Sequence, residues 1–185
     1  IHTDIENISR ASIFKNLDDE INCYKKFDKI VCVSNDVKYH FTQKTGISDN
    51  VIVQVKPINS EEILKKAEEP ITKELKKDGI IISAVGRLAY EKGYDRLLKI
   101  HRKLLRENIK NSIWIIGEGT ERENLEKQIL DLKVEKTFHL LGKKENPYPY
   151  IRQAKFFCLL SEFEGYGMVI EEAKILNKPI IITDT

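Results

Sequence analysis

Two loops of the sequence combine glycine with charged side chains in a way that could bind a phosphorylated ligand. The first, residues 86–93 (Gly-Arg-Leu-Ala-Tyr-Glu-Lys-Gly), directly follows the apolar run 80–85. If that run is a strand of a parallel sheet, its carboxyl end opens into the crevice where α/β sheets bind ligands, so Arg87 and Lys92 could clamp a diphosphate. The alternative is that both are solvated cations beside acidic neighbours, because surface Arg and Lys are common.

The second loop, residues 161–167 (Ser-Glu-Phe-Glu-Gly-Tyr-Gly), follows the apolar run 156–160 and leads into a helical pattern. A helix that begins near Gly167 would direct the free backbone N–H groups of Met168 and Val169, with the positive end of its dipole, at a bound phosphate. The sequence therefore offers a second anion site at a strand end.

Two carboxylates, Glu164 in this loop and Glu172 in the helix that follows, could face one cavity. A carboxylate accepts hydrogen bonds from paired vicinal hydroxyls, which suits Glu172 for a ribose and Glu164 for a transferred sugar. The alternatives are a solvated loop residue for Glu164 and a surface charge near a helix terminus for Glu172. We reject a glycoside-hydrolase pair of acid and nucleophile, because both carboxylates would lie beside phosphate donors and hydroxyl-rich groups.

These loops need a scaffold, and the chain predicts an α/β fold, a Rossmann-like parallel sheet with helices on both faces. Short β-branched runs alternate with amphipathic stretches, which is typical of a parallel sheet covered by helices. The expected strands are residues 29–33, 51–55, 80–85, 112–116, 137–141, 156–160 and 179–183. We expect one sheet, with Gly86, Gly142 and Ser161 at a common edge.

The intervening helices follow from apolar spacing and capping residues. Two sets of apolar residues at helical spacing are Leu97, Ile100 and Leu104, and Leu125, Ile129 and Leu132. Each set predicts a face packed on the sheet. Asn35 is the expected N-cap of a helix ending near Gly46, and Pro147 could lie in the first turn of another. Residues 61–78, rich in Lys and Glu, predict a solvated helix and linker at an organisational break.

Length, composition and charge limit the function classes. The 185 residues, with 41% hydrophobic content, suffice for one ordinary core or a core with an appendage. The sequence has no apolar run long enough to span a membrane and no signal-peptide layout at its start, so we expect a soluble, cytoplasmic protein. With 31 Lys and Arg against 29 Asp and Glu, the chain is too balanced for a general nucleic-acid binder.

Cysteine and histidine give no disulfide or metal pattern. Cys23, Cys32 and Cys158 are odd in number and far apart, and two of them lie in apolar strand-like runs, so we expect reduced core thiols. The histidines show no ligand spacing with one another or with cysteine, which argues against structural zinc. They are His2, His40, His101 and His139.

The ordered combination of these motifs resembles the retaining, metal-independent enzymes of glycosyltransferase family 4. The combination is Gly-Arg-Leu then Glu-Lys-Gly within 86–93, followed by Glu-Gly-Tyr-Gly at 164–167 and the second glutamate, Glu172. The similarity covers nearly the whole chain, up to the run 178–184. It implies the C-terminal, nucleotide-sugar-binding half of a GT-B fold. The implied reaction transfers a sugar from a UDP-sugar to a glycan or lipid-linked acceptor, as in polysaccharide biosynthesis.

The family also implies roles for individual residues. Arg87 and Lys92 would hold the diphosphate, and Glu172 the ribose. Glu164 would contact the transferred sugar, and His2 would face it from the other domain. The expected catalytic residues are thus His2, Arg87, Lys92 and Glu164. The expected nucleotide-binding residues are Gly86, Arg87, Lys92, Gly142, Lys143, Gly165, Tyr166, Gly167, Met168, Val169 and Glu172, with the base at the backbone of Gly142 and Lys143.

Family members run to roughly twice this length and place an acceptor-binding domain first, so the chain resembles a fragment. We expect residues 1–28 to be the end of that domain with the interdomain segment, and residues 29–185 to be the nucleotide-sugar-binding domain, incomplete at its C-terminus. Such a fragment should bind UDP without transferring sugar. The stretch 56–59 (Lys-Pro-Ile-Asn) departs from the Asn-Pro-Ile-Asp hinge usual in the family.

No cofactor or metal is expected besides the substrate nucleotide-sugar. The sequence has no Asp-x-Asp motif, and Arg87, Lys92 and the helix N-terminus near Gly167 could neutralise the leaving diphosphate directly. Similar enzymes act on lipid-linked acceptors, so the resemblance also implies peripheral contact with the inner face of a membrane.

Two other function classes stay open. Gly117-Glu118-Gly119 between a strand and a helix suggests a dinucleotide-dependent oxidoreductase, but Arg122 replaces the third glycine of that fingerprint and Glu118 would oppose a pyrophosphate. The other class is a non-catalytic GT-B-like partner subunit that binds a nucleotide without turnover. The intact set of two cations and two glutamates argues against it.

Overall fold

The computed structural model describes residues 14, 16–71, 79–162, 164 and 167–184. The chain divides into two compact units. The first comprises Ile1–Pro57 and Phe163–Gly167, and the second Ile58–Glu162 and Met168–Thr185. Residues 29–57 thus group with the residues before them, whereas we expected a division after residue 28. The assignment of these segments to acceptor and donor domains stays a prediction.

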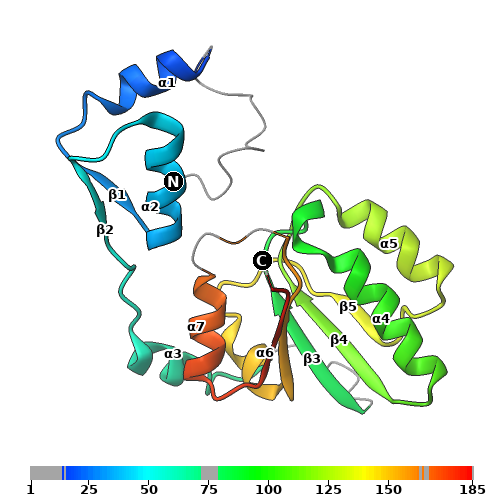
Figure 1. The fold of residues 1–185 in the computed structure, drawn as a ribbon. Coiled ribbons are helices and arrows are strands. Elements are labelled where there is room, and N and C mark those ends of the chain that lie inside the picture. The colour runs from blue at the N-terminus through cyan, green and yellow to red at the C-terminus, as the bar shows by residue number, and fades with distance from the viewer. Residues whose placement is uncertain (1–13, 15, 72–78, 163, 165–166, 185) are drawn as a thin grey trace. The chain divides into compact units, whose positions relative to one another are not determined.

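The first unit contains a two-stranded parallel sheet. β1 (Ile30–Cys32) pairs with β2 (Val51–Val53), α1 (Leu17–Tyr24) precedes them, and α2 (Asn35–Thr45) connects them (Figure 1). The buried residues of its core are Cys32, Phe41 and Val51. Because β1 and β2 pair with each other around a core of their own, our expectation of a single sheet was wrong.

The capping of α2 differs by one residue from the prediction. The N-cap is Ser34, whose Oγ accepts a hydrogen bond from the Val37 N–H at 3.1 Å, and Asn35 is the first helical residue. Either side chain can cap a helix, but the hydroxyl one position earlier reaches the N–H three residues ahead. Gly46 ends the helix with φ of +70°, as predicted.

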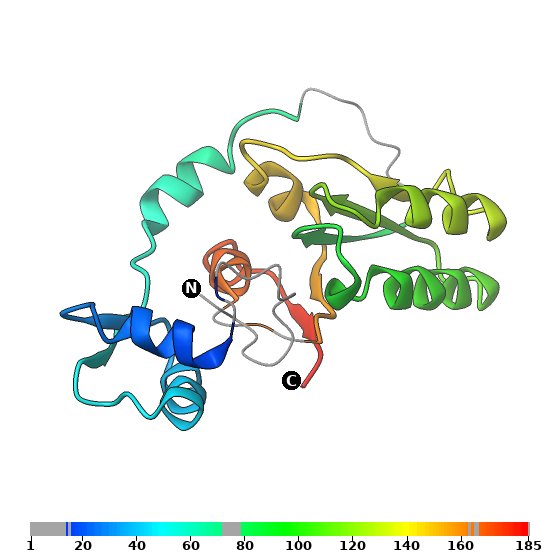
Figure 2. The same ribbon diagram turned by 90° about the horizontal axis from the view of Figure 1, so that it is seen from above.

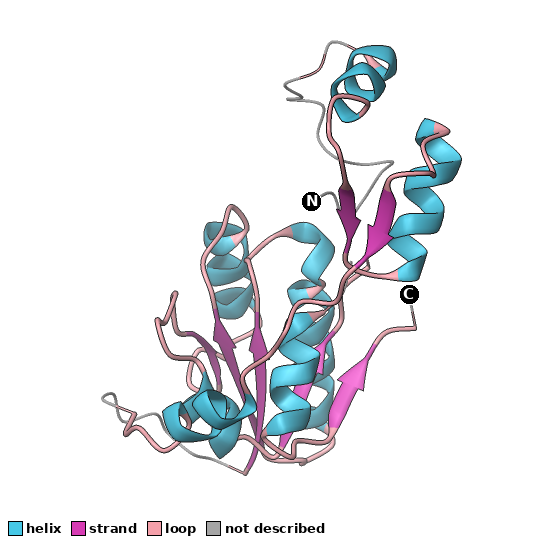
Figure 3. Cartoon of the chain, turned by 90° about the vertical axis from the view of Figure 1, so that its left-hand side faces the viewer, coloured by secondary structure: helices cyan, strands magenta, loops and turns pink. Residues whose placement is uncertain are grey.

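The second unit contains a parallel sheet (Figure 3). Its five strands follow the order β5-β4-β3-β6-β7. Its strands are β3 (Ile80–Val85), β4 (Asn111–Ile116), β5 (Phe138–Leu140), β6 (Phe156–Leu159) and β7 (Ile180–Ile182). With β1 and β2, all seven predicted strands are confirmed. β4 is buried along its whole length, which fits a strand covered on both faces.

Helices cover both faces of this sheet (Figure 2). One apolar cluster joins β3 and β4 to α4 (Tyr94–Arg106) and α5 (Arg122–Asp131). On the opposite face, α3 (Ser60–Lys66), α6 (Tyr148–Gln153) and α7 (Met168–Ile175) pack against β3, β4 and β6. The predicted Rossmann-like α/β fold is therefore confirmed.

Two predicted helix faces need correction. The buried face of α4 consists of Tyr94, Leu97, Leu98 and His101. These residues follow helical spacing from Tyr94, so Ile100, which we placed on that face, is instead 47% exposed. The segment predicted as a solvated helix contains α3, but Ile63 and Ala67 are buried in an apolar cluster, so this helix packs on the fold.

The cysteines are free thiols, as predicted, and Cys32 and Cys158 are buried. Burial raises the pKa of the Cys158 thiol to about 12, so this side chain is an inert core residue. None of the helices in the described part of the chain has the length and apolar character needed to cross a bilayer.

The strand order creates a topological switch point between β3 and β6. From β3 the chain proceeds to β4 and β5 on one side, and then crosses to β6 and β7 on the other. Open α/β sheets bind ligands outside the carboxyl ends of the strands at such a point. The loops that leave β3 and β6 are the two loops in which the sequence places its glycines and charges.

Candidate functional site

The loop after β3 begins with a tightly packed turn at Gly86. Its N–H donates to the Ile116 carbonyl at 3.0 Å, and a Cβ at this position would lie 2.8 Å from the Tyr94 hydroxyl. The Cδ and Cε atoms of Lys92 are each 3.9 Å from the same point. The lysine side chain therefore folds back over the turn, at the carboxyl end of β3.

Arg87 extends from the same turn. Its side chain is 71% exposed, and its Nη2 lies 2.7 Å from Oε1 of Glu91. The pKa of the Glu91 carboxyl is lowered: burial acts to raise it, but a bond from its own backbone N–H and the charges of Arg87 and Lys92 outweigh that effect. A diphosphate would thus compete with one half-buried carboxylate for Arg87.

Arg96 of α4 connects this loop to the loop that follows β6. Its Nη1 lies 2.7 Å from Oε1 of Glu162, and its Nη2 donates to the Leu160 carbonyl. The Glu162 N–H in turn donates to the Glu91 carbonyl at 2.8 Å. These three contacts hold the two strand-end loops of the switch point side by side. We did not predict Arg96 or Glu162 as site residues, because partners so distant in sequence leave no local pattern.

The glycines after β4 are explained by packing rather than by a cofactor. A Cβ on Gly117 would collide with the carbonyl of Gly86, and a Cβ on Gly119 with the backbone of Leu88. Arg122 stands where a dinucleotide fingerprint needs its third glycine. Its Nη1 lies 2.9 Å from Oε1 of Glu118, and its Nε lies 2.9 Å from Oε1 of Glu126. This loop therefore closes against its neighbour and neutralises its own charges, which argues against the oxidoreductase alternative.

Gly142 follows β5 and has φ of +76°, which favours glycine. Its carbonyl accepts a hydrogen bond from the Gly117 N–H at 3.0 Å. The Gly86 N–H donates to the carbonyl of Ile116, the last residue of β4 and the one directly before Gly117. Gly86 and Gly142 therefore lie on one edge of the sheet, as predicted. Ser161, two residues after β6, belongs to the same edge because all five strands are parallel.

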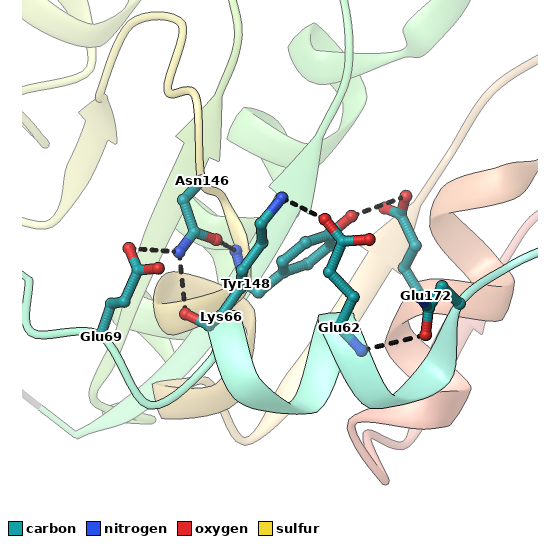
Figure 4. Close-up of polar contacts among 7 residues, drawn as sticks. Glu62, Lys66, Glu69, Asn146, Tyr148 and Glu172 are labelled. Carbon is teal, nitrogen blue, oxygen red and sulfur yellow. Dashed lines mark hydrogen bonds and ion pairs between the residues drawn. The ribbon is translucent and has the colours of Figure 1, made fainter.

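α7 begins at Met168, directly after Gly167, where the sequence predicted a helix N-terminus. The first backbone N–H groups of a helix have no intrahelical acceptor, so those of Met168 and Val169 could bind an anion. Glu172 lies half-buried in the second turn of α7, and its Oε1 accepts a hydrogen bond from the Tyr148 hydroxyl at 3.3 Å (Figure 4).

The structure thus brings much of the predicted donor site to the carboxyl edge of the main sheet. The residues on loops or helix starts at this edge are Gly86, Arg87, Lys92, Gly142, Lys143, Met168, Val169 and Glu172. Glu164 and Gly167 belong to the first compact unit, so their part in the site stays a prediction. His2, Gly165 and Tyr166 lie outside the described residues.

Comparison with known proteins gives a family match over most of the chain. The model of the family described as "Glycosyl transferases group 1" matches residues 65–185. The amylovoran biosynthesis glycosyltransferase AmsD of Erwinia amylovora is 26% identical over 184 residues, which are 99% of this chain and 50% of AmsD.

A second relative comes from Campylobacter jejuni. It is the N-acetylgalactosamine-N,N'-diacetylbacillosaminyl-diphospho-undecaprenol 4-alpha-N-acetylgalactosaminyltransferase, 32% identical over 162 residues that make up 87% of this chain and 42% of the relative. The chain therefore spans half of the first relative's length and less than half of the second's.

Solved structures share the fold. Anabaena Alr3699/HepE in complex with UDP superimposes with a TM-score of 0.73 at 18% identity, over 96% of this chain and 51% of that one. The pneumococcal O-GlcNAc transferase GtfA in complex with UDP and GlcNAc gives a TM-score of 0.68 at 19% identity, over 90% of this chain and 32% of that one. At these identities the likeness establishes the α/β architecture.

Proposed function

Because the chain belongs to the glycosyl transferases group 1 family, we propose that it carries the nucleotide-sugar site of a glycosyltransferase of the retaining, family 4 type. The observation that carries the proposal is the meeting of the loops after β3 and β6 at the switch point of the main sheet. One loop supplies Arg87 and Lys92, and the other leads into the N-terminus of α7.

These groups suit a leaving diphosphate. Cleavage of a sugar–diphosphate bond builds negative charge on the leaving group, and preorganised cations and helix N–H groups stabilise such charge. We assign this role to Arg87, Lys92 and the first turn of α7. Lys92 is already folded over Gly86, whereas Arg87 would exchange Glu91 for a phosphate oxygen.

The same cations support the proposal of a metal-independent reaction, because they would supply the positive charge at the diphosphate and the sequence has no Asp-x-Asp motif. In the proposed retaining mechanism, the acceptor attacks the sugar from the face that the diphosphate leaves, without a protein nucleophile. Glu164 would bind the sugar hydroxyls and His2 would face the sugar. Glu172 would accept hydrogen bonds from the ribose, and the backbone at Gly142 and Lys143 would contact the base.

The comparisons support UDP as the nucleotide and a carbohydrate or lipid-linked acceptor. Both of the solved structures compared above are complexes with UDP. The Campylobacter relative is named for an acceptor on diphospho-undecaprenol, and AmsD for amylovoran biosynthesis. We therefore propose a polysaccharide or glycolipid acceptor, bound by residues outside this donor site, and peripheral contact with a membrane that carries it.

Calorimetric titration of the 185-residue chain with UDP, GDP, ADP and NAD tests the donor site. We expect UDP to bind most tightly and NAD to give no heat, because Gly117 and Gly119 pack the loop after β4 against the loop after β3. Selective binding of NAD would overturn the proposal, as would the absence of binding by any nucleoside diphosphate.

A second measurement separates catalysis from binding alone. UDP release from candidate UDP-sugars is followed with and without lipid-linked acceptors, in the presence of EDTA, for the chain extended to the length of its relatives. Acceptor-dependent release that survives EDTA supports metal-independent transfer. UDP binding without release in any condition would indicate a non-catalytic partner subunit.

A further inference from the structure

Two helices contribute side chains that meet at Glu172. Tyr148 is the first residue of α6, which follows β5, and Glu172 lies in α7, which follows β6. Both helices therefore start at the carboxyl edge of the sheet, where the ligand crevice lies. The Tyr148 hydroxyl donates to Oε1 of Glu172 at 3.3 Å, and the two side chains point toward each other (Figure 4).

Tyr148 is itself fixed by Asn146. The Oδ1 of Asn146 accepts from the Tyr148 N–H at 3.2 Å. Its Nδ2 donates at 2.8 Å to the Lys66 carbonyl and at 2.8 Å to the Glu69 carboxylate, which ties the start of α6 to the end of α3 (Figure 4). The tyrosine ring also packs against the apolar cluster between α3, α6 and α7. Its hydroxyl is thus held at one place.

A glutamate on a helix can adopt several rotamers, and only some of them direct the carboxylate into the crevice. A hydrogen bond from a fixed donor selects among those rotamers. A carboxylate has about four acceptor positions, so one bond from tyrosine is compatible with bonds from the two vicinal hydroxyls of a ribose. Tyr148 can therefore restrict Glu172 without blocking it.

We propose that Tyr148 is a positioning residue that orients Glu172 toward the ribose hydroxyls of a bound nucleoside diphosphate. The inference rests on the proposed function, from which Glu172 takes its role. Tyr148 acts through Glu172 and makes no contact with the reacting atoms.

The protonation state of Tyr148 fits this role. Burial raises the pKa of its hydroxyl, and the charge of Glu172 and the hydrogen bond to it raise the pKa further. The hydroxyl therefore keeps its proton at neutral and mildly alkaline pH and remains a donor to the carboxylate.

The test is the variant Tyr148→Phe in the 185-residue chain, titrated calorimetrically with UDP and with 2′,3′-dideoxy-UDP. The phenylalanine keeps the ring and its packing. We expect the affinity for UDP to fall about three- to tenfold, the range for loss of one net hydrogen bond, while the affinity for dideoxy-UDP stays unchanged. The readout is the ratio of the two affinities, because a purely structural role of Tyr148 would leave this ratio unchanged.

The chain offers a matched control in its other compact unit. The Tyr24 hydroxyl donates to Oε1 of Glu20, also at 3.3 Å, so Tyr24→Phe removes an equivalent bond. This variant should leave both affinities unchanged. In a double-mutant cycle, Tyr148→Phe should cause no further loss of UDP affinity in the background of Glu172→Ala, which removes both acceptor oxygens.

The outcomes separate the inference from the proposed function. If the unmodified chain fails to bind UDP, the proposed function fails and the inference with it. If UDP binds but Tyr148→Phe weakens UDP and dideoxy-UDP equally, or weakens neither, the positioning role is overturned while the donor site stands. Additive losses in the cycle with Glu172→Ala would also overturn it.

Discussion

The two edges of the five-stranded sheet both carry polar side chains, but they use them differently. At the amino edge, His101 of α4 is fully buried between Asn111, which begins β4, and Thr137, which precedes β5. At the carboxyl edge, Arg87 is 71% exposed and its ion-pair partner Glu91 lies one turn away on the same loop. The side chains of the amino edge are buried against one another, whereas the carboxyl edge exposes a cation to solvent.

The amino edge satisfies its own hydrogen bonds. The Nδ1 of His101 is 2.6 Å from Oδ1 of Asn111, its Nε2 is 2.9 Å from Oγ1 of Thr137, and Nδ2 of Asn111 donates to the Ile109 carbonyl at 2.8 Å. Buried polar groups with partners stabilise a unique packing, and their loss is costly. A polar cluster therefore indicates a binding site only where the topology leaves it open.

The largest expected effect is at the amino edge. Asn111→Ala removes a partner from the buried imidazole and leaves a cavity, so we expect the free energy of unfolding to fall by about 2–4 kcal/mol. Urea unfolding followed by the fluorescence of Trp114, the only tryptophan, reports this unit because Trp114 is fully buried in β4. The exposed Asn124 is the control, and Asn124→Ala should change stability by less than about 0.5 kcal/mol.

UDP affinity of the folded Asn111→Ala variant should be unchanged. A drop in affinity would erase the distinction between the edges.

The next effect is at the carboxyl edge, and it concerns binding. Arg87→Ala and Lys92→Ala should each weaken UDP binding by about 1.5–3 kcal/mol, because each removes a charge-assisted hydrogen bond to the diphosphate. Arg122→Ala removes an arginine from the start of α5, where Glu118 and Glu126 already neutralise it, and should leave the calorimetric affinity unchanged. Equal losses for all three variants would mean that general charge, and not the switch point, attracts the nucleotide.

The pH dependence of stability sharpens the comparison further. Burial lowers the pKa of His101. The hydrogen bond to Asn111 acts to raise this pKa, but it only partly offsets burial, and the charges of His139 and Arg102 lower the pKa further. The folded state therefore binds fewer protons than the unfolded state. The contribution of the neutral His101 to the free energy of unfolding is complete above the pKa of the unfolded state, about 6.5. It is lost as the pH falls below that value, by at most about 1.4 kcal/mol per pH unit for one proton. We expect the free energy of unfolding of His101→Gln, measured by urea titration with Trp114 fluorescence, to depend less steeply on pH. The account is contradicted if the variant and the unmodified chain show the same slope.

The smallest expected effect concerns the contact between the two loops. Arg96→Ala releases Glu162 and the Leu160 carbonyl, so the loops after β3 and β6 should lose their fixed spacing. Because the ion pair is partly exposed, we expect a loss of only about 1 kcal/mol in UDP affinity by calorimetry. An unchanged affinity would show that the loops keep their spacing without Arg96.

Much of the fold follows from local sequence pattern. β-branched runs predict all seven strands, and Gly46 predicts the end of α2. The separate pairing of β1 and β2 could not be predicted, because strand periodicity does not say which strands become neighbours. Ser34 and Asn35 are both good caps, so only the observed hydrogen bond distinguishes them.

The candidate site divides in the same way. Arg87, Lys92 and Glu172 belong to local motifs and could be found from the sequence. Arg96 and Tyr148 contact partners far away in the chain, Glu162 and Glu172, and no local pattern reveals such pairs. Predictions from one sequence therefore found the residues expected to touch the ligand better than those that hold them in place.

Hydrogen–deuterium exchange of the chain with and without saturating UDP tests the central claim most directly, because it locates the ligand on the sheet. The account predicts slower exchange in peptides covering 86–93, 142–148 and 167–172, at the carboxyl edge. It predicts no change at 109–111 and 134–137, where the amino edge is already closed. Protection confined to the amino edge, or spread evenly over both edges, would contradict the account.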